Sequence, residues 1–451
     1  METKVMDMTK GDTTKLLIAF SIPMMIGNIF QQLYNVVDSS IVGKFVGSDA
    51  LGSIGVTGSV TFLFFAICNG IGSGGGIITA QFFGAGNKTL VKKCISNVAM
   101  IMLVTPIIVG SIAYFMTEPL LKMLDTQEAN MADAIVYMKI NCIGLVFVSV
   151  YNYISSMLRA LGDTKTPLYF LVVACLLNVG LDLLFICVFK MGVMGAGIAT
   201  LISQFVSGLL CLGYAMAFNP YFKLQREDFR FDKSITLNAI KIGLPLSFQF
   251  SLIAISCMAL QKVINSWGPT AVSAFAATSR IEQVIHQPYQ TLGTALSTYT
   301  GQNYGANKRD RIEEGYLKGM FLMIIFSIIM FPVMQIFGRQ ITSIFVNEAD
   351  VIEMGARGLK ICSYFYAFLG VIYVIRGVLN GLGDALFAMI NGGVEVIGRF
   401  IVPVQMTGIA AIGVWGLWWS VGVVWFFSGF TAWLRYISYK KKYLNIDSET
   451  S

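Results

Sequence analysis

The sequence predicts an all-α integral membrane protein with about twelve transmembrane helices in two six-helix lobes. Three observations support this fold class. Hydrophobic residues make up 55% of the chain and charged residues only 13%, about half the charge of a soluble domain. Apolar runs of about 20 residues, the length that crosses a bilayer, recur along the whole chain. The two halves of the chain also repeat each other.

The apolar runs can be placed to within a few residues. In the first half they lie near 15–39, 52–82, 93–115, 134–158, 166–189 and 192–216. In the second half they lie near 236–264, 271–301, 314–337, 356–379, 385–406 and 411–437. The longest polar interruption runs from Asn219 to Lys233. We therefore expect four parts, which are an N-terminal lobe (1–218), a cytoplasmic linker (219–235), a C-terminal lobe (236–437) and a cytoplasmic tail (438–451).

Matching motifs recur at one fixed separation along the chain. Three pairs of matching positions share the same difference in residue number, namely Gln81 and Gln302, Gly162 and Gly383, and Gly192 and Gly413. Six spans separate the two halves, and an even number gives both repeats the same orientation in the membrane. We expect the lobes to be related by a pseudo-two-fold axis along the membrane normal.

The basic residues predict the orientation of the chain. Lys and Arg gather in alternate loops, for example Lys88, Lys92 and Lys93 after the second run and Lys308, Arg309 and Arg311 after the eighth. By the positive-inside rule these loops and both termini lie in the cytoplasm. The net charge of +7 then reflects orientation and does not indicate nucleic-acid binding. We expect a multi-pass protein of the plasma membrane, in contact with membrane lipids.

Two acids interrupt apolar runs of the first half. Asn178 and Asp182 are four residues apart, so both lie on one face of a helix. Asp38 lies near the end of the first run, three residues after Asn35. An ionisable group inside a membrane is costly, so each acid is a candidate functional residue. The alternatives are an interfacial acid at Asp38 and a carboxylate satisfied by neighbouring hydroxyl groups at Asp182.

The two acids fall at comparable depth, because the first and fifth runs cross the membrane in the same direction. Together they predict a site that binds H⁺ or Na⁺, with Asn178 and Thr200 as neutral oxygen donors. A sodium ion would be held by Asp38, Asn178 and Asp182. We expect no other cofactor.

The second half has no equivalent pair of acids. At the separation shared by the repeated motifs, Asn178 corresponds to Arg399 and Asp182 to Pro403, so ion binding is expected in the first lobe. Glu282 with His286, and Glu395 with Arg399, are each spaced i,i+4 in the second half. Glu282 is a candidate contact for a cationic substrate, whereas Glu395 and Arg399 could instead neutralise each other within one helix. The candidate substrate-binding residues are Asn35, Gln249, Glu282, Glu395 and Arg399.

Several functional classes lack support in the sequence. The chain has one histidine and eight dispersed cysteines, which argues against a metalloenzyme. It has no P-loop, and its Gly-x-Gly-x-x-Gly match over Gly70–Gly76 lies inside an apolar run, where glycines favour close helix packing. No cleavage site marks a signal peptide. We therefore expect a transporter rather than an enzyme.

Taken together, these motifs resemble the multidrug and toxic compound extrusion (MATE) family over nearly the whole chain. The resemblance rests on the paired loops Gln81–Gly86 and Gly301–Ala306, the paired loops Arg159–Thr164 and Asn380–Asp384, and the polar motif Asn178–Asp182. It implies an inner-membrane antiporter that works as a monomer, with a V-shaped cavity and alternating access. Such a protein expels cationic, often aromatic compounds in exchange for H⁺ or Na⁺.

The resemblance also implies roles for particular residues. Asp38, Asn178, Asp182 and Thr200 match the cation site of the family's first lobe, and Tyr137 matches a further member of it. The alternative function is a flippase for lipid-linked saccharides, from the same broad superfamily. A flippase would need a cationic cavity, for which Arg376 and Arg399 are the only indications.

Overall fold

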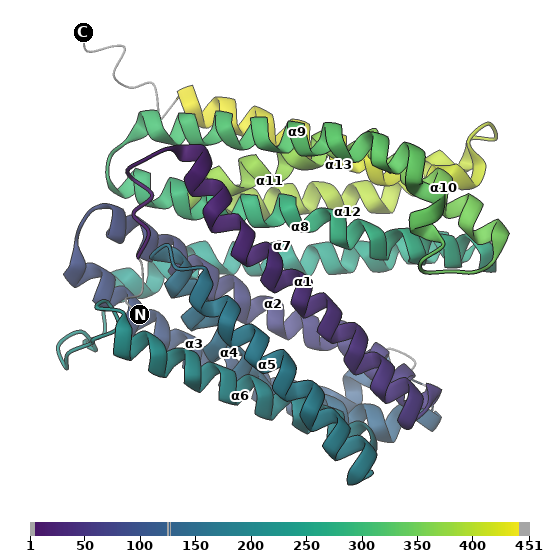
Figure 1. Ribbon diagram of the computed structural model, residues 1–451, viewed down its shortest axis with the longest axis horizontal. Coiled ribbons are helices and arrows are strands. Elements are labelled where there is room, and N and C mark those ends of the chain that lie inside the picture. Colours follow the sequence, from purple (N-terminus) through teal and green to yellow (C-terminus); the bar gives the residue numbers. More distant parts are fainter. Residues whose placement is uncertain (1–4, 124–125, 127, 442–451) are drawn as a thin grey trace. The chain divides into compact units, whose positions relative to one another are not determined.

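The computed structural model describes residues 5–123, 126 and 128–441, and every regular element in this part of the chain is helical (Figure 1). The first half contains α1 (Thr13–Phe45), α2 (Ser48–Gly84), α3 (Lys88–Met123), α4 (Glu128–Ala160), α5 (Lys165–Asp182), η1 (Leu183–Val188) and α6 (Gly192–Phe218). The second half contains α7 (Lys233–Asn265), α8 (Pro269–Gly305), α9 (Arg309–Thr342), α10 (Ala349–Ser363), α11 (Tyr366–Gly381), α12 (Ala385–Gly408), η2 (Gly413–Trp415) and α13 (Gly416–Tyr439). The predicted all-α fold is confirmed. The predicted tail lies outside the described residues from 442 onward.

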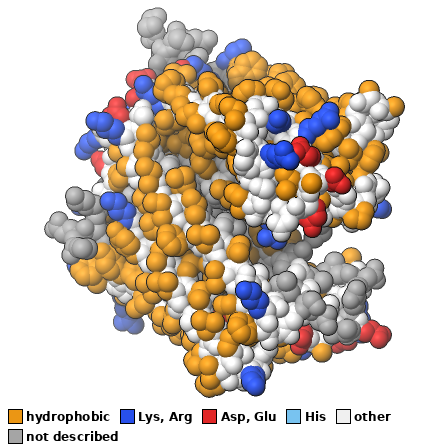
Figure 2. Space-filling model, turned by 45° about the vertical axis from the view of Figure 1, so that its right-hand side comes forward, with side chains coloured by type: hydrophobic (Ala, Val, Ile, Leu, Met, Phe, Trp, Pro, Cys, Tyr) orange, Lys and Arg blue, Asp and Glu red, His pale blue; other side chains and the backbone are white. Residues whose placement is uncertain are grey.

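Most of these helices suit a membrane. Nine of the described helices are long and apolar enough to span one, and α10 with α11, bent by 54° at their junction, forms a tenth candidate. Figure 2 shows hydrophobic side chains over much of the visible surface. The exposed hydrophobic residues of the described chain include Leu176, Phe321 and Ile328. Helices α7 and α8 coincide with the two remaining predicted runs and carry more polar residues. The break between α10 and α11 divides the apolar run near 356–379 into two helices, where the sequence predicted one.

The chain divides into two compact units. Unit 1 comprises the residues up to Asp7 and Ile22–Ser251, and unit 2 comprises Met8–Ser21 and the residues from Leu252 onward. Both boundaries fall inside long helices, α1 and α7. The lobe limits proposed from the sequence stay a prediction.

Glycines allow close helix packing within unit 1. A Cβ atom at Gly70 would collide with Ser247 of α7, and one at Gly74 would lie 2.5 Å from the Gly243 nitrogen. Helices α2 and α4 also pack closely, and Ser156 Oγ donates to the Gly72 carbonyl at 3.1 Å. The Gly70–Gly76 run is therefore a packing surface, as its place in an apolar run predicts.

Unit 2 repeats this arrangement between α8 and α11. A Cβ atom at Gly377 would collide with the Gly293 carbonyl oxygen, and one at Gly293 would lie 2.9 Å from the Tyr373 carbonyl oxygen. The two backbones are thus in direct contact. This contact holds together α8, which carries Glu282 and His286, and α11, which carries Arg376.

The Gly301–Ala306 motif anchors the N-terminal segment of unit 2. Gln302 Oε1 accepts a hydrogen bond from the Met8 amide at 2.8 Å, and Asn303 Nδ2 donates to the Met8 carbonyl at 3.2 Å. Arg311 donates to the Gly11 carbonyl at 3.0 Å. Gln302 and Asn303 thus pair backbone groups of Met8 that would otherwise be buried without partners. The motif therefore has a structural role at the start of α1.

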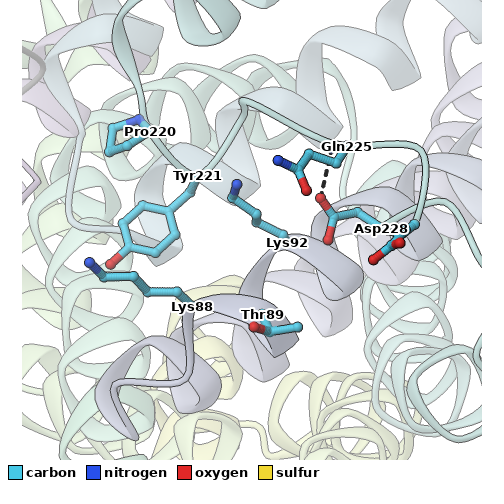
Figure 3. Close-up of a pocket in the computed structure, with 8 residues that line it drawn as sticks. Lys88, Thr89, Lys92, Pro220, Tyr221, Gln225 and Asp228 are labelled. Carbon is cyan, nitrogen blue, oxygen red and sulfur yellow. Dashed lines mark hydrogen bonds between the residues drawn. The ribbon is translucent and has the colours of Figure 1, made fainter.

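The loop between α6 and α7 is held against the start of α3 in unit 1 and encloses a pocket of about 460 Å³ (Figure 3). Lys92 Nζ donates to the Lys223 carbonyl at 2.8 Å, and the Gln225 backbone N–H donates to Asp228 Oδ2 at 2.8 Å. Burial, with a smaller effect of Asp7, raises the pKa of the Tyr221 phenol in this pocket, which keeps it neutral. Both lysines and carboxylates line the pocket, so their charges offset one another.

The Gly293–Gly377 contact predicts the effect of an added methyl group. The substitution Gly377→Ala is expected to lower the stability of the protein by about 1–3 kcal/mol, because the new Cβ meets backbone that cannot move aside. Thermal unfolding in lipid or detergent measures this effect. Gly393→Ala is the matched control, since its Cβ has no neighbour within 4 Å and helix propensity favours Ala by about 0.5–1 kcal/mol. Equal unfolding temperatures for the two variants would contradict this account of the packing.

Candidate functional site

Asp38 and Asp182 meet in unit 1. Asp38 lies on α1 and Asp182 is the last residue of α5. Their carboxyl groups lie within hydrogen-bonding reach of each other. Asp182 is 0% exposed and Asp38 is half-buried. The Oδ1 atom of each is buried without a hydrogen-bond partner among the described residues. Two acids that the sequence places on separate helices thus form one pair.

Asn178 and Thr200 complete the hydrogen bonding on one side of this pair. The Asn178 side-chain amide has one orientation in which both its nitrogen and its oxygen form hydrogen bonds. In this orientation the nitrogen donates to Asp182 Oδ2 at 2.8 Å. The amide oxygen then accepts from the Thr200 backbone nitrogen at 3.1 Å and from Thr200 Oγ1 at 3.3 Å. The i,i+4 spacing of Asn178 and Asp182 therefore gives a direct contact, and α6 supplies the residue behind it.

Tyr34 is a member of this cluster that we did not identify from the sequence. Its hydroxyl group lies within hydrogen-bonding reach of the Thr200 hydroxyl, and the Asp38 charge acts on it. The available signal was spacing, because Tyr34 lies four residues before Asp38 on the same helical face. Asn35, a candidate substrate-binding residue, is exposed.

Tyr137 borders the two acids from α4. The charges of both Asp38 and Asp182 act on its hydroxyl group, and Asn141 Nδ2 donates to the Tyr137 carbonyl at 2.9 Å. The Tyr137 ring packs against a hydrophobic cluster that includes Val42 and Ile186. These two residues lie four positions after Asp38 and Asp182, about one helical turn further along their chains. The cluster therefore covers the acid pair with apolar side chains.

The helix changes its winding directly after Asp182. Residues Leu183–Val188 form the π-helix η1, in which each amide bonds to the fifth preceding residue instead of the fourth. Such segments are rare and are often found at functional sites. Nothing in the apolar sequence Leu-Leu-Phe-Ile-Cys-Val distinguishes this turn from an ordinary helix.

The other candidate substrate-binding residues are divided between the two units. Gln249 is buried on α7 within unit 1. Glu282, Glu395 and Arg399 lie in unit 2. In that unit Glu282 Oε1 accepts a hydrogen bond from the Tyr366 hydroxyl at 2.8 Å.

Glu395 is the centre of a buried ion network in unit 2. Arg376 forms its closest ion pair, and the side chains of Arg376 and Glu395 are 9% and 6% exposed. Arg399, the partner expected from the i,i+4 spacing, is further away at 3.7 Å. Asn391 Oδ1 accepts from Arg376 Nε at 2.6 Å, and Ser256 Oγ lies 2.9 Å from Arg399. The predicted pair exists, but its main cation is Arg376, which lies on another helix.

Comparison with known proteins identifies relatives along the whole chain. The MatE family model matches residues 23–184 and 245–403, and these two matches agree with the internal repeat. The chain is 31% identical to the probable multidrug resistance protein YpnP of Bacillus subtilis, over 96% of this chain and 97% of that protein. It is 23% identical to the multidrug export protein MepA of Staphylococcus saprophyticus, over 91% of each chain.

A solved structure has the same fold. An outward-facing multidrug resistance MATE family transporter of the MOP superfamily superimposes with a TM-score of 0.87, at 22% identity, over 99% of each chain. This similarity confirms the architecture predicted from the sequence, with twelve transmembrane helices in two lobes.

The network around Glu395 predicts a large loss of stability when its charge is removed. Glu395→Gln leaves Arg376 buried without a full counter-charge, which is expected to cost about 3–5 kcal/mol. Glu353→Gln is the control, because Glu353 and its partner Arg339 are 60% and 67% exposed and such pairs contribute at most about 1 kcal/mol. Thermal unfolding of the two purified variants measures the difference. A network without structural importance would give both variants the same unfolding temperature.

Proposed function

Because the chain belongs to the MATE family of transporters, we propose that it is a cation-coupled antiporter that exports cationic, often aromatic compounds by alternating access. The observation that carries this proposal is the contact between Asp38 and Asp182. Two carboxyl groups so close together in apolar surroundings repel each other strongly when both are charged. The pair is therefore stable only with a bound proton or metal cation.

The donor atoms around the pair suit H⁺ or Na⁺. The Oδ1 atoms of Asp38 and Asp182 have no hydrogen-bond partner among the described residues, so both are available to a cation. The Asn178 side chain, which already bonds Asp182 and Thr200, would hold the second carboxylate in place or supply an oxygen atom to Na⁺. Tyr34 and Tyr137 border the same space and would orient the acids.

Cation binding would bias the conformation of unit 1. Loading from outside changes the charge of the site by one unit, and release to the cytoplasm restores it. A change of charge inside an apolar bundle alters the relative stability of two packings of the helices. The cation gradient would in this way supply the free energy for export of the substrate.

Substrate binding would involve Asn35 and Gln249, whose side chains lie outside the buried Glu395 network, whereas Glu282 is already paired with Tyr366 and His286. Glu395 and Arg399 fit a structural role better, since Glu395 is already paired with Arg376 and Arg399 inside that network. Localisation in the plasma membrane, cytoplasmic termini and function as a monomer belong to the same proposal. They follow from the loop charges and from the presence of both family repeats in one chain.

A flippase for lipid-linked saccharides remains the alternative. Arg376 and Arg399 together with Glu395 carry one net positive charge, which could attract a phosphate. Both guanidinium groups, however, contact Glu395. This pairing makes the cationic surface weak and favours the antiporter.

The test is export of a fluorescent organic cation from proteoliposomes, with a proton gradient and a sodium gradient imposed separately. We expect one of the two gradients alone to drive export, which identifies the coupling ion. Export that depends on neither gradient, together with transport of an anionic lipid-linked saccharide, would replace the antiporter with the flippase.

Neutralising the two acids together is the matching test of the site. We expect the double variant Asp38→Asn, Asp182→Asn to lower gradient-driven export at least about tenfold, since neither amide takes up a proton or balances the charge of a cation. Glu353→Gln, on an exposed pair, should export at the normal rate. Undiminished export by the double variant would remove these acids from the coupling mechanism.

A further inference from the structure

Unit 2 contains a second ionisable pair outside the Glu395 network. His286 Nε2 lies 3.5 Å from Glu282 Oε2, one turn apart on α8. This separation exceeds an ordinary hydrogen bond, and both atoms are buried without a hydrogen-bond partner among the described residues. The other carboxylate oxygen is fixed by the Tyr366 hydroxyl. One carboxylate oxygen and one imidazole nitrogen therefore face each other with unused bonding capacity.

Helix packing does not require these polar groups. In the first half, the positions that correspond to Glu282, His286 and Tyr366 in the internal repeat are Thr61, Phe65 and Leu145. Helices α2 and α4 pack as closely there as α8 and α11 do in unit 2. A buried acid that the fold can do without, and that costs free energy, indicates a function.

The surroundings of the pair are aromatic and carry few charges. Glu282 acts electrostatically on Tyr289 of α8, Cys362 of α10 and Tyr366 of α11. The His286 ring lies 5.4 Å from the Trp425 ring of α13 and 6.4 Å from that of Tyr373 of α11. From α9, Ser327 reaches this region through its hydrogen bond to Tyr289.

The nearest fixed charges belong to the Glu395 network. Arg376, Glu395 and Arg399 act on the Tyr373 hydroxyl group. Their positive charges exceed the negative one by a single unit. Tyr373 therefore borders both this network and the imidazole of His286.

The space around the Glu282–His286 pair limits the size of the ligand that can bind there. Tyr366, Trp425 and Cys362 are all buried around the pair, and this packing would have to open to admit an organic cation. A proton needs no such space. The His286 side chain is 26% exposed and that of Glu282 is 12% exposed, so a proton would reach the imidazole first and be shared with the deeper carboxylate.

We propose that Glu282 and His286 form a second proton-binding site, located in unit 2 and separate from the Asp38–Asp182 pair. A proton on His286 converts the 3.5 Å contact into a charge-assisted hydrogen bond. The charge of unit 2 then changes with pH whichever ion the first site uses. The consequence for transport rests on the proposed function, whereas proton binding itself does not.

The chain offers a direct probe, because His286 is its only histidine. Nuclear magnetic resonance of histidine-labelled protein in lipid nanodiscs follows one imidazole through a pH titration. An opposite charge this close favours the imidazolium form. We therefore expect that half-protonation of the imidazole in Glu282→Gln requires a proton concentration about tenfold higher, or more, than in the unmodified protein. Glu353→Gln, on an exposed pair of the same unit, should leave the midpoint in place. A change of less than twofold in Glu282→Gln would overturn the proposal.

A second variant keeps the test valid if Glu282→Gln does not fold. Glu282→Asp retains the charge, but its side chain is one methylene group shorter, so the carboxylate lies further from His286. A smaller shift of the midpoint in the same direction is expected. An unchanged midpoint would again overturn the proposal. The transport assay separates this result from the proposed function. Loss of coupling in the Asp38, Asp182 double variant tests the first site only, and the His286 titration tests the second only.

Discussion

A carboxylate inside an apolar helix bundle must be neutralised, and this requirement shapes both units of the protein. Removing an ionised acid from water costs several kcal/mol unless a partner compensates. The described residues contain three different solutions to this problem. Asp38 and Asp182 face each other, Glu395 is held between two guanidinium groups, and Glu282 lies between a phenol and an imidazole.

The three solutions differ in how easily their charge can change. At Glu395 the cations belong to the protein, so the network keeps its charge and stabilises the fold. At Asp38 and Asp182 no side-chain cation is available among the described residues, so the compensating charge must come from solution. The Glu282–His286 pair is intermediate, because its cation is a side chain that is itself charged only when protonated. The two repeats have diverged at this point, because Arg399, one of the cations beside Glu395, occupies the position that corresponds to Asn178 in the first repeat.

The helices and the acid pair could be predicted because their signals are local. Apolar runs of membrane-spanning length gave nearly every helix, and the i,i+4 spacing of Asn178 and Asp182 gave a real contact. Partners on different helices could not be assigned in this way. Arg376 instead of Arg399 is the closest cation to Glu395, and Tyr34 instead of Asn35 turns toward the acids, because tertiary packing decides which face of a helix is buried. The break between α10 and α11 and the π-helix after Asp182 also lie in uniformly apolar sequence, which carries no local signal for either.

The anchoring of the N-terminal segment has a consequence for biosynthesis. The Met8 amide is bonded to Gln302, 294 residues further along the chain. Proteins are made from the N-terminus at about 5–20 residues per second, so the first helix emerges roughly 15–60 seconds before its anchor exists. The beginning of α1 therefore reaches its final state only after α8 and α9 have been synthesised. In the meantime this segment is surrounded by the membrane and the insertion machinery. A chain truncated before the Gly301–Ala306 motif would leave Met8 and the start of α1 without these native contacts.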